Sequence, residues 1–173
     1  MNENIKDSQP KRGKKNVTRL KFLVVFTKNL GLTDKDIAEK AGCARNSIQY
    51  MWSVDDVMID RIYTIVENCG FTIRFSLENN APTKQGTAYL KIDKLAKVTD
   101  DDVVPARLSF LRIAMKNTGL TTREIAKRLD MSENSLFYYF RQDNTSMSFL
   151  NRFAEEFGYD LKVNISENKP KQA

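Results

Sequence analysis

The chain has 173 residues, 28 of them basic and 22 acidic, and it contains no histidine. It therefore lacks the usual general base near neutral pH and the commonest metal ligand, so we expect neither an enzyme nor a metal or cofactor site. Cys43 and Cys69 form no CxxC pair, and we expect both to be reduced. The longest apolar run, residues 22–26, is too short to span a bilayer. We expect a soluble, cytoplasmic protein without a membrane partner.

The net charge of +6 lies mostly at the two ends of the chain. Residues 1–18 carry a net charge of +3 and residues 168–173 one of +2, whereas the segments between them are close to neutral. We interpret residues 1–17 as a flexible basic arm, in which Lys14 and Lys15 either lie along phosphates or only improve solubility. We expect residues 168–173 to be a disordered tail.

An internal duplication organises the rest of the sequence. Residues 19–75 align without a gap with residues 107–163, at an offset of 88, and 17 of the 57 pairs are identical. Each copy is large enough to bury a core of its own. We therefore predict two related domains, residues 18–78 and 106–167, joined by a linker of residues 79–105. Within this linker, residues 87–92 fit either a strand or a helix.

In each copy, helical periodicity comes first and strand-like alternation last. A first helix begins near position 20 or 108 and ends before a glycine at 31 or 119. Capping-box patterns, Thr33 with Asp36 and Thr121 with Glu124, predict the start of a second helix. We expect a third helix to begin near position 44 or 132 and a fourth near 56 or 145. Alternating residues 71–77 and 159–165 then predict two half-buried strands.

In each copy, the second and third predicted helices are short and are joined by a tight turn, which is the pattern of a helix-turn-helix. Residues 32–48 read L-T-x-x-D-I-A-x-x-A-G-x-x-x-N-S-I, and residues 120–136 read L-T-x-x-E-I-A-x-x-L-x-x-S-x-N-S-L. Both resemble the helix-turn-helix of the phage-repressor/Cro-like (XRE) family. The resemblance implies a mostly α protein with two tandem lambda-repressor-like helix-turn-helix domains, each followed here by one short β-strand. We expect the two strands to pair antiparallel, since a lone strand would leave its hydrogen-bonding groups exposed.

Two features depart from the family pattern. Asp130 stands where the family usually has a turn glycine, although aspartate tolerates the left-handed conformation better than most residues. Asp55 and Asp56 follow the third helix of the first copy, near where phosphates would approach. We expect these two carboxylates to weaken DNA binding by the first copy.

The resemblance implies that the third helix of each copy enters the major groove by its N-terminal end. The side chains that would then face base edges are Arg45, Asn46, Gln49 and Tyr50 in the first copy and Glu133, Asn134, Phe137 and Tyr138 in the second. For the asparagines, helix capping is an alternative role, and for the tyrosines it is partial core packing. Further candidates for phosphate contact are Thr33, Lys35, Thr121, Arg123 and Arg141. Helical spacing assigns to the core Ile37, Ala38, Ile48, Trp52, Ile125, Ala126, Leu136 and Phe140.

These observations predict a sequence-specific double-stranded DNA-binding protein that regulates transcription. A duplicated chain supplies both halves of a dimer, so we expect a monomer that acts as a pseudo-dimer, with higher oligomers also open. Because Arg45 and Glu133 differ in charge, we expect an operator with two unlike half-sites. The alternative is a protein-protein interaction module that binds a polymerase subunit, a toxin or another protein. The near-neutral domain bodies favour it, and so do Asp55 and Asp56.

Overall fold

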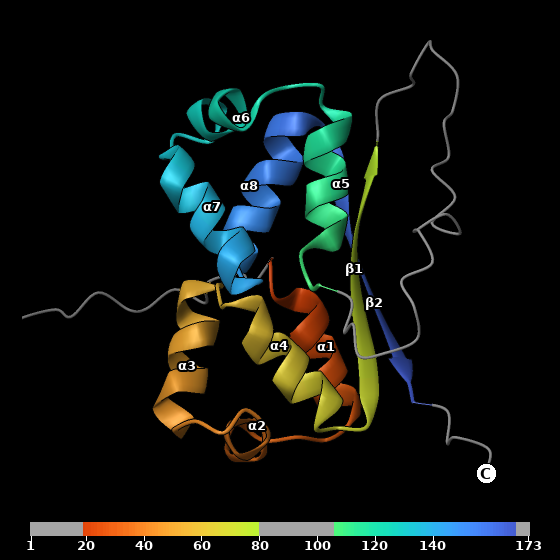
Figure 1. Cartoon of the computed structure of the whole chain (residues 1–173). Helices are drawn as coiled ribbons and strands as arrows, with labels where there is room; N and C mark the ends of the chain where they lie inside the picture. Colours follow the sequence, from red (N-terminus) through yellow and green to blue (C-terminus); the bar gives the residue numbers. More distant parts are fainter. Residues whose placement is uncertain (1–18, 80–105, 169–173) are drawn as a thin grey trace, which may run out of the picture.

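The structure, a computed structural model, describes residues 19–79 and 106–168. The expected basic arm with Lys14 and Lys15, and residues 80–105 with the undecided segment 87–92, lie outside these ranges. Within the described ranges the chain is mostly helical, with eight helices and one two-stranded antiparallel sheet (Figure 1). The first copy contains α1 (Lys21–Asn29), α2 (Asp34–Lys40), α3 (Arg45–Val54), α4 (Ile59–Glu67) and β1 (Phe71–Asn79). The second contains α5 (Ser109–Asn117), α6 (Thr122–Arg128), α7 (Glu133–Gln142), α8 (Met147–Phe157) and β2 (Tyr159–Glu167).

The duplication seen in the sequence is also present in the structure. Four of the five pairs of equivalent elements have bounds that repeat at the offset of 88. In the fifth pair the helices begin at equivalent residues, but α8 ends two residues later than α4. The mostly α fold class and the order of four helices and one strand in each copy are therefore confirmed. None of the described helices is both long and apolar enough to cross a membrane.

Local interactions explain where the second helices begin and end. Thr33 accepts from the Asp36 N–H at 3.3 Å, and the Asp36 carboxylate accepts from the Thr33 N–H at 2.8 Å. Thr121 and Glu124 form the same capping box in the second copy, so both predicted boxes are confirmed. After α6, Asp130 adopts a φ of 49° and takes the left-handed conformation that glycine has at the same place in the first copy.

The two strands join the copies, as predicted. They pair antiparallel from Phe71 opposite Glu167 to Asn79 opposite Tyr159. In this register Phe75 stands opposite Val163, and these two residues occupy equivalent positions of the copies. A pseudo-twofold axis that exchanges the two copies therefore passes through this pair.

A second inter-copy contact lies where α4 and α8 begin. Met58 pairs antiparallel with Ser146, which is again an equivalent position. The Ile59 N–H donates to the Thr145 carbonyl at 2.8 Å, and the Met147 N–H donates to the Val57 carbonyl at 2.9 Å. The predicted starts of the fourth helices, near 56 and 145, are therefore wrong. The residues just before 59 and 147 are extended and form this contact between the copies. Helices α4 and α8 therefore begin after it in the chain.

The buried side chains form one cluster that includes residues of both copies. Phe75 lies at its centre, because its ring contacts Phe22 at 6.3 Å between centroids and the equivalent Phe110 at 6.2 Å. The expected core positions are buried, except that Trp52 and Phe140 are half-buried. Beyond β2, Asn168 donates its backbone N–H to the Gly70 carbonyl. The residue that we placed first in the tail thus contacts the other copy.

Candidate functional site

Helices α3 and α7 lie on the same side of the molecule, and the sheet lies on the other side (Figure 1). Their C-terminal ends approach the contact between the copies, whereas α2 and α6 lie toward opposite ends of the molecule (Figure 1). Because an axis exchanges the two copies, α3 and α7 present equivalent faces to the solvent.

The first two turns of these helices expose all eight of the predicted base-reading side chains, Arg45, Asn46, Gln49, Tyr50, Glu133, Asn134, Phe137 and Tyr138. The aromatic members are the most notable, because large apolar side chains are usually buried when no partner covers them. Tyr50 is 68% exposed, Phe137 53% and Tyr138 57%. Partial core packing, the alternative role for the two tyrosines, is therefore wrong.

Helix capping, the alternative role for the two asparagines, is also wrong. Helix α3 begins after Ala44, which has no capping side chain, and α7 begins after Ser132, whose hydroxyl accepts from the Ser135 N–H at 3.0 Å. Asn46 and Asn134 are exposed in the second position of each helix. Among the described residues, neither amide has a hydrogen-bond partner that would explain its position.

The phosphate candidates at the second helices fall into two groups. The hydroxyls of Thr33 and Thr121 donate to the carboxylates of Asp36 and Glu124 within the capping boxes, at 2.6 and 2.8 Å. Neither hydroxyl hydrogen can then be donated to a phosphate while its capping box is intact. The cationic side chains of Lys35 and Arg123, two residues further along, are exposed.

The two second helices differ in charge. Helix α2 has three carboxylates against Lys35 and Lys40, a net charge of −1. Helix α6 has Arg123, Lys127 and Arg128 against one carboxylate, a net charge of +2. A polyanion that contacts both helices would therefore be attracted more strongly by the second copy.

The structure shows what holds the carboxylates of Asp55 and Asp56. The Asp55 carboxylate accepts from the backbone N–H groups of Arg19 and Leu20, both at 3.0 Å. The Asp56 carboxylate accepts from Val57 at 2.9 Å and, across the contact between the copies, from Ser148 at 2.8 Å. Both carboxylates are thus held by backbone N–H groups of the protein, and the expected weakening of DNA binding by the first copy stays a prediction.

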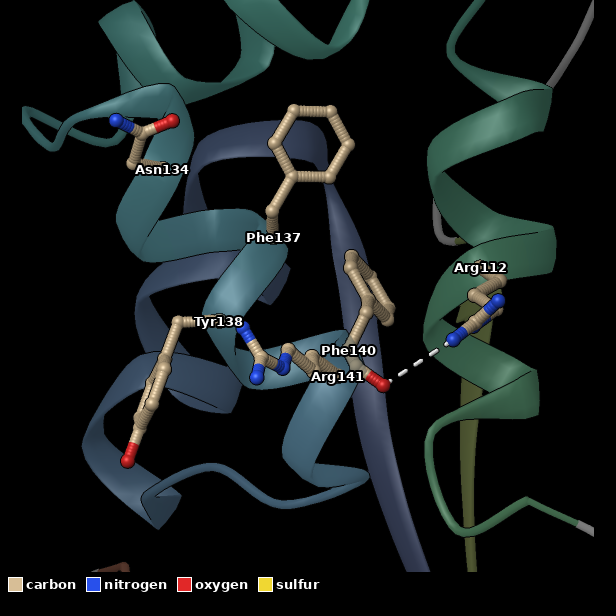
Figure 2. A pocket seen from close by; sticks show the side chains of 6 residues that line it. All are labelled: Arg112, Asn134, Phe137, Tyr138, Phe140 and Arg141. Carbon is tan, nitrogen blue, oxygen red and sulfur yellow. Dashed lines mark hydrogen bonds between the residues drawn. The ribbon is translucent and has the colours of Figure 1, made fainter.

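A depression of about 590 Å³ lies along α7. Four of its six lining residues were predicted contacts: Asn134, Phe137, Tyr138 and Arg141 (Figure 2). The other two are Phe140 and Arg112, which comes from α5 (Figure 2). The Arg112 guanidinium lies 4.9 Å from the centre of the Phe140 ring and donates to the Phe140 carbonyl at 3.2 Å.

Arg112 is the residue of this surface that the sequence reasoning missed. The alignment of the two copies contains a signal for it, because the equivalent residue of the first copy is Val24. In the first copy, α3 is instead tied to α2 by the Trp52 indole, whose N–H donates to Asp34 at 3.2 Å. The two copies thus hold their third helices by different contacts.

In comparisons with known proteins, no family model, no curated protein and no solved structure matches this chain.

Proposed function

We propose that the protein binds double-stranded DNA in a sequence-specific manner and regulates transcription. Each copy serves as a helix-turn-helix domain of the phage-repressor/Cro-like type, in which α2 or α6 crosses the backbone and α3 or α7 enters the major groove. The observation that carries this proposal is the display of Asn46 and Tyr50, and of the equivalent Asn134 and Tyr138, on one side of a pseudo-twofold molecule.

The chemistry of these side chains suits base edges. An asparagine amide bonds the N6 and N7 edge of adenine with two hydrogen bonds, and an arginine such as Arg45 prefers guanine. Glu133 replaces Arg45 in the second copy and would accept from cytosine. The two half-sites of the operator therefore differ.

The contacts between the copies support a fused pseudo-dimer. The strand pair and the Met58–Ser146 contact lie on the axis, so each limits how far one copy can rotate against the other. Dimeric readers of this class bind half-sites about one helical turn apart, roughly 34 to 36 Å. A single chain with fixed copies reads both halves without a second subunit.

Two experiments test the proposal. The first selects bound duplexes from a random pool at near-physiological salt, and the expected product is one motif with two unlike half-sites. The second measures the affinity for that duplex at increasing salt concentrations. Each phosphate that the protein neutralises should add a slope of about −0.9 to the plot of log affinity against log salt concentration.

Failure to enrich any duplex would overturn the proposal. It would favour a protein-protein interaction module, with a polymerase subunit, a toxin or another protein as partner. An apolar protein contact does not weaken steeply as salt rises.

A further inference from the structure

The surface of the second copy differs from that of the first at three equivalent positions. Phe137, Arg112 and Arg141 line the depression along α7. The first copy has Gln49, Val24 and Ser53 at these positions. The duplicated scaffold is thus the same, whereas the second copy presents one exposed ring and two guanidinium groups that the first copy lacks.

The Phe137 side chain is not part of the hydrophobic core, so packing does not explain why an apolar ring stands at this position. Its side chain is 53% exposed, and it lies in the second turn of α7, among the side chains proposed to face the major groove. An exposed phenyl ring gains free energy when an apolar group of a partner covers it. Among the groups that base pairs present in the major groove, the apolar one is the 5-methyl group of thymine.

The two arginines supply positive charge beside this ring. Contact with the ring and carbonyl of Phe140 fixes Arg112 against α7. Within residues 19–79 and 106–168, no carboxylate forms an ion pair with Arg112 or Arg141. Both charges are therefore available for contact with phosphates near Phe137.

We propose that Phe137 reads the 5-methyl group of a thymine, so that the second copy selects its half-site by an apolar contact. The first copy selects its half-site by polar contacts from Arg45 and Gln49. This inference rests on the proposed function and assigns a different readout chemistry to each copy.

The test replaces thymidine by deoxyuridine, which removes the 5-methyl group and keeps the base pairing. Each thymidine of the duplex enriched by selection is replaced in turn, and fluorescence anisotropy measures the affinity of the full chain at constant salt. Burial of one methyl-sized group corresponds to about fourfold in affinity. We expect this loss at one or two positions of the half-site bound by the second copy.

Two variants at equivalent positions identify the residue responsible. Phe137→Ala should bind the thymidine and deoxyuridine duplexes equally well. Gln49→Ala, the matched control, should bind more weakly but keep the preference of about fourfold. Because both side chains are exposed, neither change should alter the thermal unfolding of the protein.

The outcomes separate this inference from the proposed function. If the chain binds the selected duplex but no deoxyuridine position weakens it, the inference is overturned and DNA binding stands. The same holds if Phe137→Ala keeps the thymidine preference. If no duplex is enriched at all, the proposed function fails and the inference fails with it.

Discussion

Phe75 stands directly opposite Val163 in the antiparallel sheet, and the two residues are equivalent members of the two copies. The ring of Phe75 contacts Phe22 and Phe110, which are also equivalent to each other. The axis that relates the copies thus passes through a packed aromatic cluster rather than through solvent. This cluster thus packs β1 of the first copy against α1 of its own copy and α5 of the other.

The first prediction is that Phe75→Ala destabilises both copies together. Truncation of a buried phenylalanine costs about 3 to 5 kcal/mol, and this ring contacts side chains of both copies. Urea unfolding followed by Trp52 fluorescence reports on the first copy, and far-ultraviolet circular dichroism reports on both. We expect the two transitions to coincide in the wild type and to shift together in the variant.

Val163→Ala is the matched control for that variant. Val163 is half-buried in the equivalent position, so its truncation should cost clearly less. Separate transitions of the two probes in the wild-type protein would show that the copies unfold independently, which would contradict a core shared by the two copies.

The second prediction concerns Asp55 and Asp143, which are identical in the two copies. Each has a positive φ, of 52° and 47°, and each carboxylate accepts from two backbone N–H groups just before the first helix of its copy. Asp55→Ala and Asp143→Ala should each lower the free energy of unfolding by about 2 kcal/mol, because the N–H groups lose their acceptor and alanine resists a positive φ. Chemical denaturation measures the change.

Asparagine at these two positions provides the control. It tolerates the left-handed conformation and keeps one acceptor oxygen, so Asp55→Asn should lose less stability than Asp55→Ala. Equal losses would show that the hydrogen bonds to Arg19 and Leu20 do not hold the first helix in place.

The third prediction is a loss of stability in acid. Hydrogen bonds from Thr33 lower the pKa of Asp36, and hydrogen bonds from Thr121 lower the pKa of Glu124. The folded protein therefore binds fewer protons at these carboxylates than the unfolded chain. Their stabilising contribution is complete above the ordinary carboxyl range, about pH 4 to 4.5, and is lost as the pH falls below it.

Amide variants measure this contribution. Asp36→Asn combined with Glu124→Gln removes the titration but keeps an acceptor oxygen for the helix N-terminus. We expect the free energy of unfolding of the double variant to fall less steeply between about pH 5 and pH 3, values that bracket the ordinary carboxyl range. Parallel pH profiles of variant and wild type would contradict the capping role of the two carboxylates.

The sequence was sufficient to predict the elements but not the contacts between the copies. Capping boxes, glycine stops and the alternation in residues 71–77 depend on neighbours in the chain, so they could be predicted from local patterns. The roles of Asp56 and Asn144 could not, since each accepts from the fourth helix of the other copy, from Ser148 and from Asp60. The identity of Asp55 and Asp143 in the alignment was a signal for a structural role that the sequence reasoning did not use.

The fourth prediction concerns the two asparagines that we propose to read bases. Asn46→Ala and Asn134→Ala should each cost about 1 to 3 kcal/mol on the selected duplex, because each removes a pair of hydrogen bonds to one base. The free energy of unfolding should not change, since both side chains are exposed and cap no helix. A uniform loss of affinity on all duplexes would instead indicate a phosphate contact.

The measurement that tests the central claim most directly changes the spacing of the two half-sites. The claim is that one chain, with its copies fixed by the sheet and by the Met58–Ser146 contact, binds both half-sites of one duplex. Insertion of about five base pairs, half a helical turn, places the half-sites on opposite faces of the duplex. We predict that the affinity then falls to that of a duplex with a single half-site. Unchanged affinity for the lengthened duplex would contradict the claim.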